Sequence, residues 1–431
     1  MSPSYSLTVS PVPDQVPTSA DSTFYWAKTG STGWFSSTVG PGLGEFGLVN
    51  DRNIDFVRIA SAVLAADRSA SRSGRLSRWN TREISVTVDV IAVKPWRAVQ
   101  GEFEALLGFL TGDTWHLDFK RGRGQGEQLA ARATGVSRVV LFSGGADSAI
   151  GALVSATELQ GKGKHALLSH YSARTLAPLQ RQLGARTEEL IPGVLADHVQ
   201  VHHSRGRTAP NGKAYGRENS TRSRSLLFIA LGLALASVEG VPLWIPENGY
   251  ASINPPLSSN RRGSLSTKTT HPAFFNGLRK ILAEVGAHHD FSNPFAELTK
   301  GEMFARLRDQ IGADAASGFL SVTTSCSHTG ARTFHIPPKV QCGVCFGCVL
   351  RKSSFIAAGI EDKTPYLDPA GDAQKERWLA EKSVAIAMKD FLQTPLTESD
   401  LATLRIPADI ALSDAADLCR RAMDELRGVS L

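Results

Sequence analysis

The sequence predicts an α/β fold whose core is a parallel sheet, and three observations support that prediction. Short apolar runs alternate with helical patterns through the middle of the chain, which is typical of βαβ units. A glycine-rich string at residues 143–148 follows the first of these runs and precedes a helical pattern. Four of the five cysteines lie within residues 326–348, which indicates a small metal-bound segment. Because 431 residues are too many for one ordinary core, we expect about two or three domains.

Residues 1–135 are expected to form an N-terminal α+β extension. Residues 54–67 carry an apolar period, residues 84–90 alternate between apolar and polar as a strand does, and residues 96–110 have helical spacing. The segment of residues 68–82 contains a series of arginines among serines, which predicts an exposed, solvated loop. Contact with nucleic acid is the alternative, but the segment offers little aromatic surface for stacking bases.

Residues 136–362 are expected to form the main α/β domain, and residues 363–431 a helical C-terminal segment. The apolar runs that predict strands occupy residues 138–142, 165–169, 198–202 and 242–246. The helical patterns occupy residues 149–159, 176–190 and 224–238. Ligands of a parallel sheet bind at the carboxyl ends of its strands, so a site is expected in the loop after the first strand. In the C-terminal segment, residues 401–426 are predicted to form a helical, amphipathic tail, in which Cys419 is a buried apolar residue.

The loop Ser143-Gly144-Gly145-Ala146-Asp147-Ser148 is suited to a phosphate group. Glycines let the backbone approach a ligand closely and expose its N–H groups. The following helix presents its positive N-terminal end, and the two serines add hydroxyl donors. Asp147 does not suit a plain anion cradle unless it orients the loop or holds Mg²⁺. The alternative, a simple strand-to-helix turn, fits this string less well than it would fit two glycines alone.

The clustered cysteines have the spacing of a metal site. Cys326 is followed by Cys342, Cys345 and Cys348, and the last three are separated by two residues each. These three can wrap one ion, and Cys326 can complete a tetrahedron. Four thiolates leave no open position, so a zinc knuckle with a structural Zn²⁺ is predicted at residues 326–348. An iron–sulfur cluster is the alternative.

Composition and charge limit the class of partners. The content of 42% hydrophobic and 20% charged residues is typical of a globular soluble protein. A net charge of +6 is a mild excess for this length, compatible with anionic ligands and only weakly with nucleic acid. The N-terminus has no basic head followed by an apolar stretch, and the longest apolar run is too short to span a bilayer. Together with the clustered cysteines, these features predict a cytoplasmic protein without membrane contact.

Residues 143–148 resemble the signature of the PP-loop ATP pyrophosphatases, a Rossmann-like branch of the adenine-nucleotide hydrolase-like α/β folds. The resemblance implies cleavage of ATP between its α and β phosphates and transfer of AMP to a substrate oxygen. It implies catalytic roles for Ser143, Asp147 and Ser148, with Lys300 facing ATP or substrate. For Lys300 the alternative is a surface lysine at a helix start. The string is not a Walker-type loop, because no Gly-Lys-Ser/Thr follows it.

Together with the cysteine run, residues 136–362 resemble the 7-cyano-7-deazaguanine synthase (QueC-like) family. An arginine follows the family's zinc knuckle, as Arg351 does here. The family's Tyr-Gly-Gln after the second strand resembles Tyr171-Ser172, and its Arg-Asn before a long helix resembles the segment from Arg222 to Arg224. The resemblance implies that these residues contact ATP. The family's Gly-Val-Asn is matched loosely by Glu247-Asn248, which implies a place beside the substrate base, with a helix cap as the alternative.

The chain also departs from that family. The Tyr-Pro-Asp-Cys-Arg substrate segment is absent, and Lys268, Thr270 and His271 stand roughly in its place as candidates for the substrate pocket. The N-terminal 135 residues have no counterpart in the short housekeeping enzyme. This layout resembles the QueC-like component (QatC) of the Qat anti-phage defence system, which implies partner proteins in a defence complex.

The resemblance implies an ATP-dependent adenylating ligase that uses ATP, Mg²⁺ and Zn²⁺ and acts on a 7-deazaguanine carboxylate or a similar acid. A carboxylate is a poor electrophile, whereas an acyl-adenylate carries AMP as a good leaving group. Ammonia or a protein amine would then capture the acyl group. One alternative is a tRNA-modifying PP-loop enzyme, although the metal-bound cysteines leave no evident sulfur carrier. The other is a non-catalytic nucleotide-binding component of a defence complex, against which the intact loop string argues.

Overall fold

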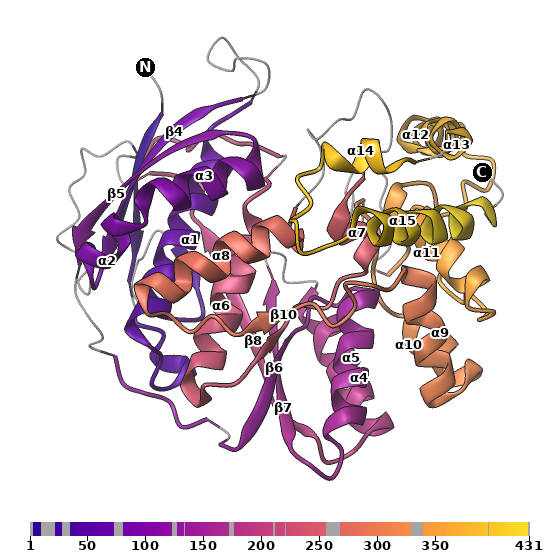
Figure 1. Ribbon diagram of the computed structural model, residues 1–431, viewed down its shortest axis with the longest axis horizontal. Coiled ribbons are helices and arrows are strands. Elements are labelled where there is room, and N and C mark those ends of the chain that lie inside the picture. Colours follow the sequence, from indigo (N-terminus) through magenta and orange to yellow (C-terminus); the bar gives the residue numbers. More distant parts are fainter. Residues whose placement is uncertain are drawn as a thin grey trace.

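The computed structural model describes residues 3–9, 22–27, 35–72, 81–122, 127–132, 134–171, 176–209, 212–219, 221–255, 268–328, 339–394 and 396–429. Within these ranges the chain has an α/β architecture with two sheets made almost entirely of parallel strands (Figure 1). The parallel-sheet core predicted from the sequence is therefore confirmed. No described helix combines the length and the apolar character that crossing a membrane requires.

The N-terminal sheet has the strand order β2-β1-β4-β5, and its neighbouring strands are all parallel. Alternate residues of β4 are buried, as the period of two predicts. The strands are β1 (Ser4–Val9), β2 (Thr23–Trp26), β4 (Glu83–Val90) and β5 (Thr114–Arg121). The helices of this part are η2 (Gly44–Phe46, a 3₁₀ turn), α1 (Asp51–Ser69), α2 (Val93–Ala98) and α3 (Gln100–Thr111).

The central sheet has the order β10-β9-β6-β7-β8-β3, and only its edge strand β3 is antiparallel. Its middle strands are apolar and largely buried because helices cover both faces of a parallel sheet. The strands are β3 (Phe35–Ser37), β6 (Val136–Leu141), β7 (Lys164–Tyr171), β8 (Leu195–Arg205), β9 (Leu243–Trp244) and β10 (Phe291–Ser292). The helices between them are α4 (Ala146–Leu159), α5 (Leu176–Leu190), α6 (Arg224–Glu239), α7 (Gly249–Ile253) and α8 (Pro272–Val285).

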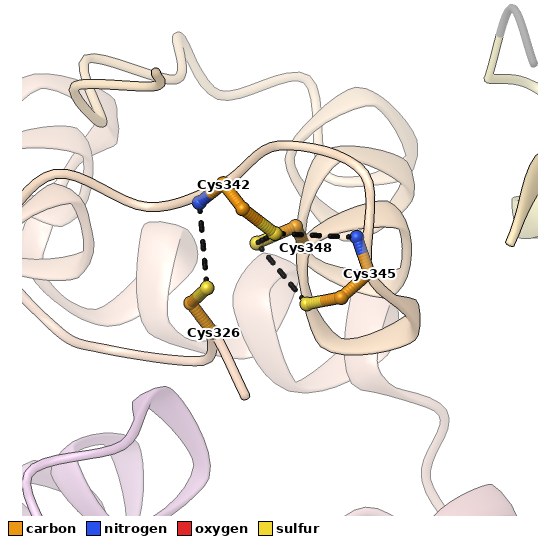
Figure 2. Close-up of side chains that lie close together, drawn as sticks. All are labelled: Cys326, Cys342, Cys345 and Cys348. Carbon is orange, nitrogen blue, oxygen red and sulfur yellow. Dashed lines mark hydrogen bonds between the residues drawn. The ribbon is translucent and has the colours of Figure 1, made fainter. Parts of the chain in front are cut away.

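The remainder of the described chain is helical, as predicted for the C-terminal segment. The cysteines of the predicted knuckle lie beside the start of α11, and Figure 2 shows their sulfur atoms converging. The amphipathic tail predicted at residues 401–426 consists of two helices, α14 and α15, separated by residues 403–411. The helices are α9 (Lys300–Ile311), α10 (Ala313–Ser321), α11 (Phe346–Ala357), α12 (Ala373–Lys382), α13 (Ala385–Gln393), α14 (Glu398–Ala402) and α15 (Leu412–Arg427).

The N-terminal part and the central sheet share a hydrophobic core. Helix α1 packs on α6, and buried residues of both helices, such as Val63 and Leu231, belong to the same cluster. Strand β3 comes from the N-terminal part but pairs with β8, so that Phe35 lies opposite Arg205. In Figure 1 the N-terminal elements lie on the left, the C-terminal helices on the right, and the central sheet between them.

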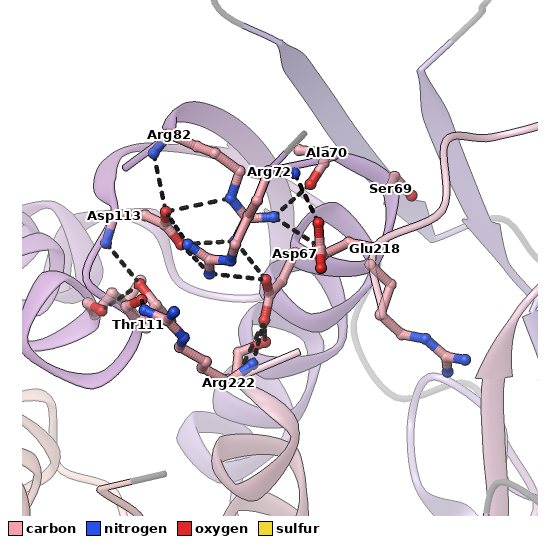
Figure 3. Close-up of polar contacts among 12 residues, drawn as sticks. Asp67, Ser69, Ala70, Arg72, Arg82, Thr111, Asp113, Glu218 and Arg222 are labelled. Atoms are coloured by element: carbon pink, nitrogen blue, oxygen red, sulfur yellow. Dashed lines mark hydrogen bonds and ion pairs between the residues drawn. The ribbon is translucent and has the colours of Figure 1, made fainter. Parts of the chain in front are cut away.

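Two of the arginines predicted to lie in a solvated loop, Arg72 and Arg82, are buried, whereas Arg68 is half-buried on α1. Arg72 is 7% exposed and Arg82 is 3% exposed. Arg72 binds both carboxylate oxygens of Asp113 at 2.7 Å, and Arg82 bridges Asp113 and Asp67 (Figure 3). The solvated-loop prediction is therefore wrong for these two side chains, because buried carboxylates from α1 and the α3–β5 turn pair with them. The other arginines between them, at positions 75 and 78, lie outside the described residues.

Candidate active site

The glycine-rich loop connects β6 to α4, at the carboxyl edge of the central sheet. Gly144 has φ +90°, a backbone conformation that residues with a Cβ rarely adopt. The Ser143 N–H donates to the Ser148 hydroxyl at 3.1 Å, and that hydroxyl donates to the Gly145 carbonyl at 3.0 Å. The Gly145 N–H donates to the Ser143 hydroxyl at 3.2 Å. These bonds fold the loop tightly over the N-terminus of α4, where an anion is favoured.

Two neighbouring segments hold the loop from outside. The Gln180 side chain donates to the Ser143 carbonyl at 3.1 Å, and the Thr324 N–H donates to the Gly144 carbonyl at 3.1 Å. A Cβ at Gly145 would lie only 3.4 Å from the Thr324 carbonyl oxygen. The sequence motif therefore did not reveal all the residues that shape the loop. Gln180 carried no signal, whereas Thr324 stands two residues before a predicted metal ligand.

Asp147 belongs to a buried polar cluster beside the loop. One of its oxygens pairs with the ammonium of Lys300. The other accepts the Asn248 backbone N–H at 3.0 Å and the Asn248 side-chain amide at 2.7 Å. Lys300 begins α9, directly after its N-cap Thr299. The structure thus unites two residues predicted to be catalytic and ties them to the residue that caps α7.

Burial and contacts within the cluster shift the pKa values of Asp147 and Glu247. Burial alone would raise the pKa of Asp147, but the Lys300 ammonium and the hydrogen bonds outweigh burial, so the pKa lies below its usual value. Burial, and then the negative charge of Asp147, raise the pKa of Glu247 well above its usual value. The contacts of the cluster therefore favour the ionised form of Asp147 and the protonated form of Glu247.

A large cavity opens beside the loop. Its volume is about 1070 Å³, and it lies over the carboxyl ends of β6 and β9. Its polar lining includes Ser143, Ser148, Glu247 and Arg224. Arg224 is the first residue of α6, and no carboxylate among the described residues pairs with its guanidinium. A cavity of this size, with hydroxyls, loop amides and one free guanidinium on its wall, can accept a nucleotide and a small organic acid.

The structure places the other residues predicted for ATP differently. The Arg222 guanidinium donates to the Thr111 carbonyl at 2.7 Å and lines another, smaller cavity. The Tyr171 ring lies 5.3 Å from the His202 ring at the end of β7, outside the lining of the large cavity. Ser172 lies outside the described residues. The placement supports contact with ATP for Arg224 and does not support it for Arg222.

Among the residues predicted for the substrate, Glu247 lines the large cavity and the others do not. Asn248 is the N-cap of α7, and His271 is the N-cap of α8. Thr270 is buried, with its hydroxyl 2.8 Å from that of Ser252. Lys268 lines the smaller cavity together with Arg222. The neighbouring Thr269, which the sequence did not single out, lines the large cavity instead.

The four predicted metal ligands converge. Their sulfur atoms lie within 4.8 Å of one another, with Cys342 and Cys348 3.8 Å apart and Cys345 and Cys348 3.6 Å apart. A tetrahedral zinc ion with Zn–S bonds of about 2.3 Å places its sulfurs ~3.8 Å apart. The donor set therefore fits one zinc ion. An iron–sulfur cluster fits less well, because several metal atoms between the thiolates would hold them further apart.

The cysteine cluster is physically joined to the loop. Cys326 lines the large cavity, and it follows Thr324, whose N–H holds Gly144. Arg351, on α11, donates to the hydroxyl of Thr323 at 2.8 Å and to the carbonyl of Leu320. A metal held by the cysteines would therefore fix both the end of α10 and the segment that supports the loop.

Comparison with known proteins finds several relatives that share one name. No family model matches the chain. The chain is 30% identical over 253 residues to the 7-cyano-7-deazaguanine synthase of Syntrophobacter fumaroxidans, covering 53% of this chain and 95% of that protein. It is 31% identical over 244 residues to the protein of the same name from Thiobacillus denitrificans, covering 97% of it. With that of Methanopyrus kandleri the identity is 29% over 243 residues, covering 98% of it.

Proposed function

Because the chain belongs to the 7-cyano-7-deazaguanine synthase family, we propose that it is an ATP-dependent ligase that adenylates the carboxylate of a 7-deazaguanine or a similar acid. One observation carries the proposal: the large cavity brings the PP-loop, Arg224 and Glu247 to one surface. The loop end of this cavity suits phosphates, and its apolar walls suit a flat heterocycle. A non-catalytic nucleotide-binding protein would not need the buried cluster of Asp147 and Lys300.

In this proposal the acid's carboxylate oxygen attacks the α-phosphorus of ATP, and the bond between the α-phosphorus and the bridging oxygen breaks. The leaving pyrophosphate lies against the loop amides and the N-terminus of α4, where its charge is stabilised. The Arg224 guanidinium pairs with phosphate oxygens. Asp147 orients rather than reacts: it holds Lys300 and Asn248 behind the loop. Lys300 is thus a positioning residue.

Mg²⁺ remains a prediction that the described carboxylates do not support directly. Both oxygens of Asp147 are engaged by Lys300 and Asn248. Glu247 is the acidic residue that lines the described part of the cavity, and burial and the charge of Asp147 raise its pKa well above the usual value, which favours its protonated form. We therefore assign no step to a protein-bound magnesium ion. In this proposal Mg²⁺ arrives with the phosphates of ATP.

The acceptor of the acyl group is an amine. With ammonia the product is an amide, and a second activation gives the nitrile. With a protein amine the product is a conjugate, and AMP leaves as the new C–N bond forms. The missing substrate segment and the N-terminal extension favour the protein amine, since both set this chain apart from the short enzyme of the family. A role in anti-phage defence, beside other proteins of a Qat-type complex, rests on this layout alone.

The test uses the zinc-loaded full chain with α-labelled ATP, Mg²⁺ and 7-carboxy-7-deazaguanine, with and without ammonium or a co-expressed partner protein. We expect release of AMP and pyrophosphate that depends on the acid. Asp147→Ala should abolish it, because Lys300 and Asn248 lose their common partner. Asp309→Ala is the matched control, since Asp309 is exposed on α9 and, among the described residues, its carboxylate contacts Arg308.

The added component that accelerates AMP release identifies the acceptor, and mass spectrometry of the partner shows whether it gains the deazaguanine mass. Acid-independent ATP binding without AMP release would instead indicate a nucleotide sensor. AMP release that requires transfer RNA would move the function to RNA modification. Equal loss of activity in both aspartate variants would remove the assigned role of Asp147.

A further inference from the structure

A second cavity lies at the C-terminal end of α3, next to the large one. Its volume is about 320 Å³, and three separate parts of the chain bring cationic side chains to it. Arg222 precedes α6, Lys268 precedes α8, and Arg405 lies between α14 and α15. Their sequence neighbours Arg224 and Thr269 line the large cavity, so the two cavities are adjacent but have separate walls.

The aromatic ring of Phe109 organises two of these cations. The Lys268 ammonium lies 4.1 Å from the ring centroid, and the Arg405 guanidinium carbon lies 5.9 Å from it. The His271 ring meets the same ring edge to face at 5.2 Å. Burial, and then the charge of Lys268, lower the pKa of His271 to about 4, so this histidine is neutral near pH 7. The positive charge of the cavity therefore comes from the three longer side chains.

The positive charge is not neutralised within the described structure. None of the described residues that line this cavity is acidic. The charges of buried Asp67 and Asp113 act on Arg222, but both carboxylates are already paired with Arg72 and Arg82 (Figure 3). Arg222 and Lys268 do donate to carbonyls at the end of α3, but a helix C-terminus offsets only about half a unit charge.

The three cationic side chains also repel one another. Burial, and then the charges of Arg405 and Arg222, lower the pKa of Lys268. Bringing like charges together is unfavourable unless an anion occupies the space between them. Arg405 is exposed, and no described residue accepts a hydrogen bond from it, so its guanidinium is available to a ligand from solvent. An anion that enters would relieve this repulsion and gain charge-assisted hydrogen bonds.

We propose that this cavity, formed by Phe109, Arg222, Lys268 and Arg405, binds carboxylate side chains of an acidic peptide segment on a partner protein. Convergent cations in one concavity are the usual means of recognising acidic motifs. A single-stranded nucleic acid would instead need free aromatic faces along a groove, and Lys268 already covers the face of Phe109. The identification of this partner as the amine donor rests on the proposed function; the binding itself does not.

The test measures equilibrium binding of a fluorescein-labelled oligoglutamate peptide to the zinc-loaded full chain by anisotropy at low ionic strength, without ATP. Lys268→Gln combined with Arg405→Gln should weaken binding at least about tenfold. Arg222 is left in place because it caps α3. The control combines Arg377→Gln with Lys389→Gln, which removes the same charge from exposed positions on α12 and α13 and should change the affinity little. Thermal melting verifies that both double variants are folded.

Equal weakening in the two double variants would show that net charge alone attracts the peptide, and it would overturn the proposal. Binding of labelled oligouridylate that depends on Lys268 and Arg405, with no binding of oligoglutamate, would replace the peptide by RNA. An oligoglutamine peptide should not bind. The outcome is separate from that of the AMP assay. Peptide binding without adenylation would support the peptide site and contradict the proposed ligase activity. Adenylation without peptide binding would support the ligase activity and contradict the peptide site.

Discussion

At the scale of single residues, the buried ion pair of Asp147 and Lys300 offers the first stability test. Asp147→Asn leaves a buried ammonium without its counter-charge, and we expect it to cost about 3–5 kcal/mol of unfolding free energy. The double variant Asp147→Asn/Lys300→Met should lose less than the sum of the single variants, because no charge is then left unpaired. Urea unfolding of the four proteins gives the coupling energy.

The matched cycle uses the exposed pair of Lys280 and Glu102, whose charged atoms are 3.0 Å apart with exposures of 67% and 50%. An exposed pair contributes only about 0–1 kcal/mol, so Glu102→Gln and Lys280→Met should be nearly additive. Equal coupling energies in the two cycles would show that the buried pair contributes no more than an exposed pair. That result would contradict the orienting role assigned to Asp147.

A dependence on pH follows from Glu247. In the unfolded chain a glutamate has a pKa of about 4.3, and in the fold burial and then Asp147 raise it. Between these two values the unfolded state releases a proton that the folded state keeps. The stabilisation is complete below the unfolded pKa and is lost as pH rises through the folded pKa, at up to about 1.4 kcal/mol per pH unit.

Glutamine does not titrate, so the Glu247→Gln protein does not lose stability in this way. Its unfolding free energy minus that of the unaltered protein should therefore increase as pH rises. Urea unfolding from about pH 5 to about pH 9 measures the gap, and groups that titrate in both proteins cancel in the difference. Asp147 does not contribute to the pH dependence in this range. Because its pKa is lowered in the fold, its effect on stability is confined to pH values below the ordinary titration range of aspartate. Parallel profiles for the two proteins would contradict the assigned protonation of Glu247.

The roles of individual side chains were harder to predict than the motif that contains them. The string at residues 143–148 fixed the place of the loop because its chemistry is local. Arg222 and Arg224 look equivalent in the sequence, but Asp67 binds the Arg222 and Ser223 backbone N–H groups at 2.9 and 3.0 Å and turns Arg222 toward α3. Asp67 is distant in sequence, so no local pattern could separate the two arginines.

At the scale of elements, the cysteine knuckle supports α11 and the segment before it, and zinc should therefore stabilise the loop at a distance. We expect about one zinc ion per chain by elemental analysis and no visible absorption from iron. Cys345→Ser should release the metal, lower the melting temperature and weaken ATP binding, since Thr324 would no longer be held against Gly144.

Cys419→Ala is the control for this prediction. Cys419 is also buried, but it packs among apolar residues of α15 and is no part of the metal cluster. The Cys419→Ala protein should keep its zinc and its affinity for ATP, but it should be less stable because the smaller side chain leaves a cavity in the core. A Cys345→Ser protein that loses zinc but binds ATP unchanged would show that the knuckle and the loop are not coupled.

Periodicity predicted those elements whose residues face a single kind of surroundings, such as the buried strands of the sheet. The helix at residues 176–190 agrees with α5, and the apolar runs agree with β6 and β7, because buried parallel strands are largely apolar. The run at residues 198–202 also falls within β8, whose buried residues alternate with more exposed ones. The tail at residues 401–426 was predicted as one amphipathic stretch. Its break at residues 403–411, which brings Arg405 to α3, depends on packing against another part of the molecule and leaves no local signal.

At the scale of the whole molecule, the sequence indicates where segments differ in character but not how they pack. The boundary predicted at residues 135 and 136 falls between two sheets that share a hydrophobic core through α1 and α6. The antiparallel edge strand β3 crosses the same boundary to pair with β8. Neither contact has a signature in composition, since one is a helix face and the other a short edge strand.

This shared core predicts that the two parts depend on each other to fold. A chain of residues 136–431 would expose the buried face of α6, including Leu227, Leu231 and Leu235, and leave β8 as an open sheet edge. We expect it to aggregate when expressed alone and to become soluble when residues 1–135 are supplied on a second chain. The full chain should unfold in one calorimetric transition whose van't Hoff and calorimetric enthalpies agree. A soluble fragment that releases AMP by itself would instead show that the N-terminal part is a separate domain, whose function would then lie in binding the partner rather than in supporting the fold.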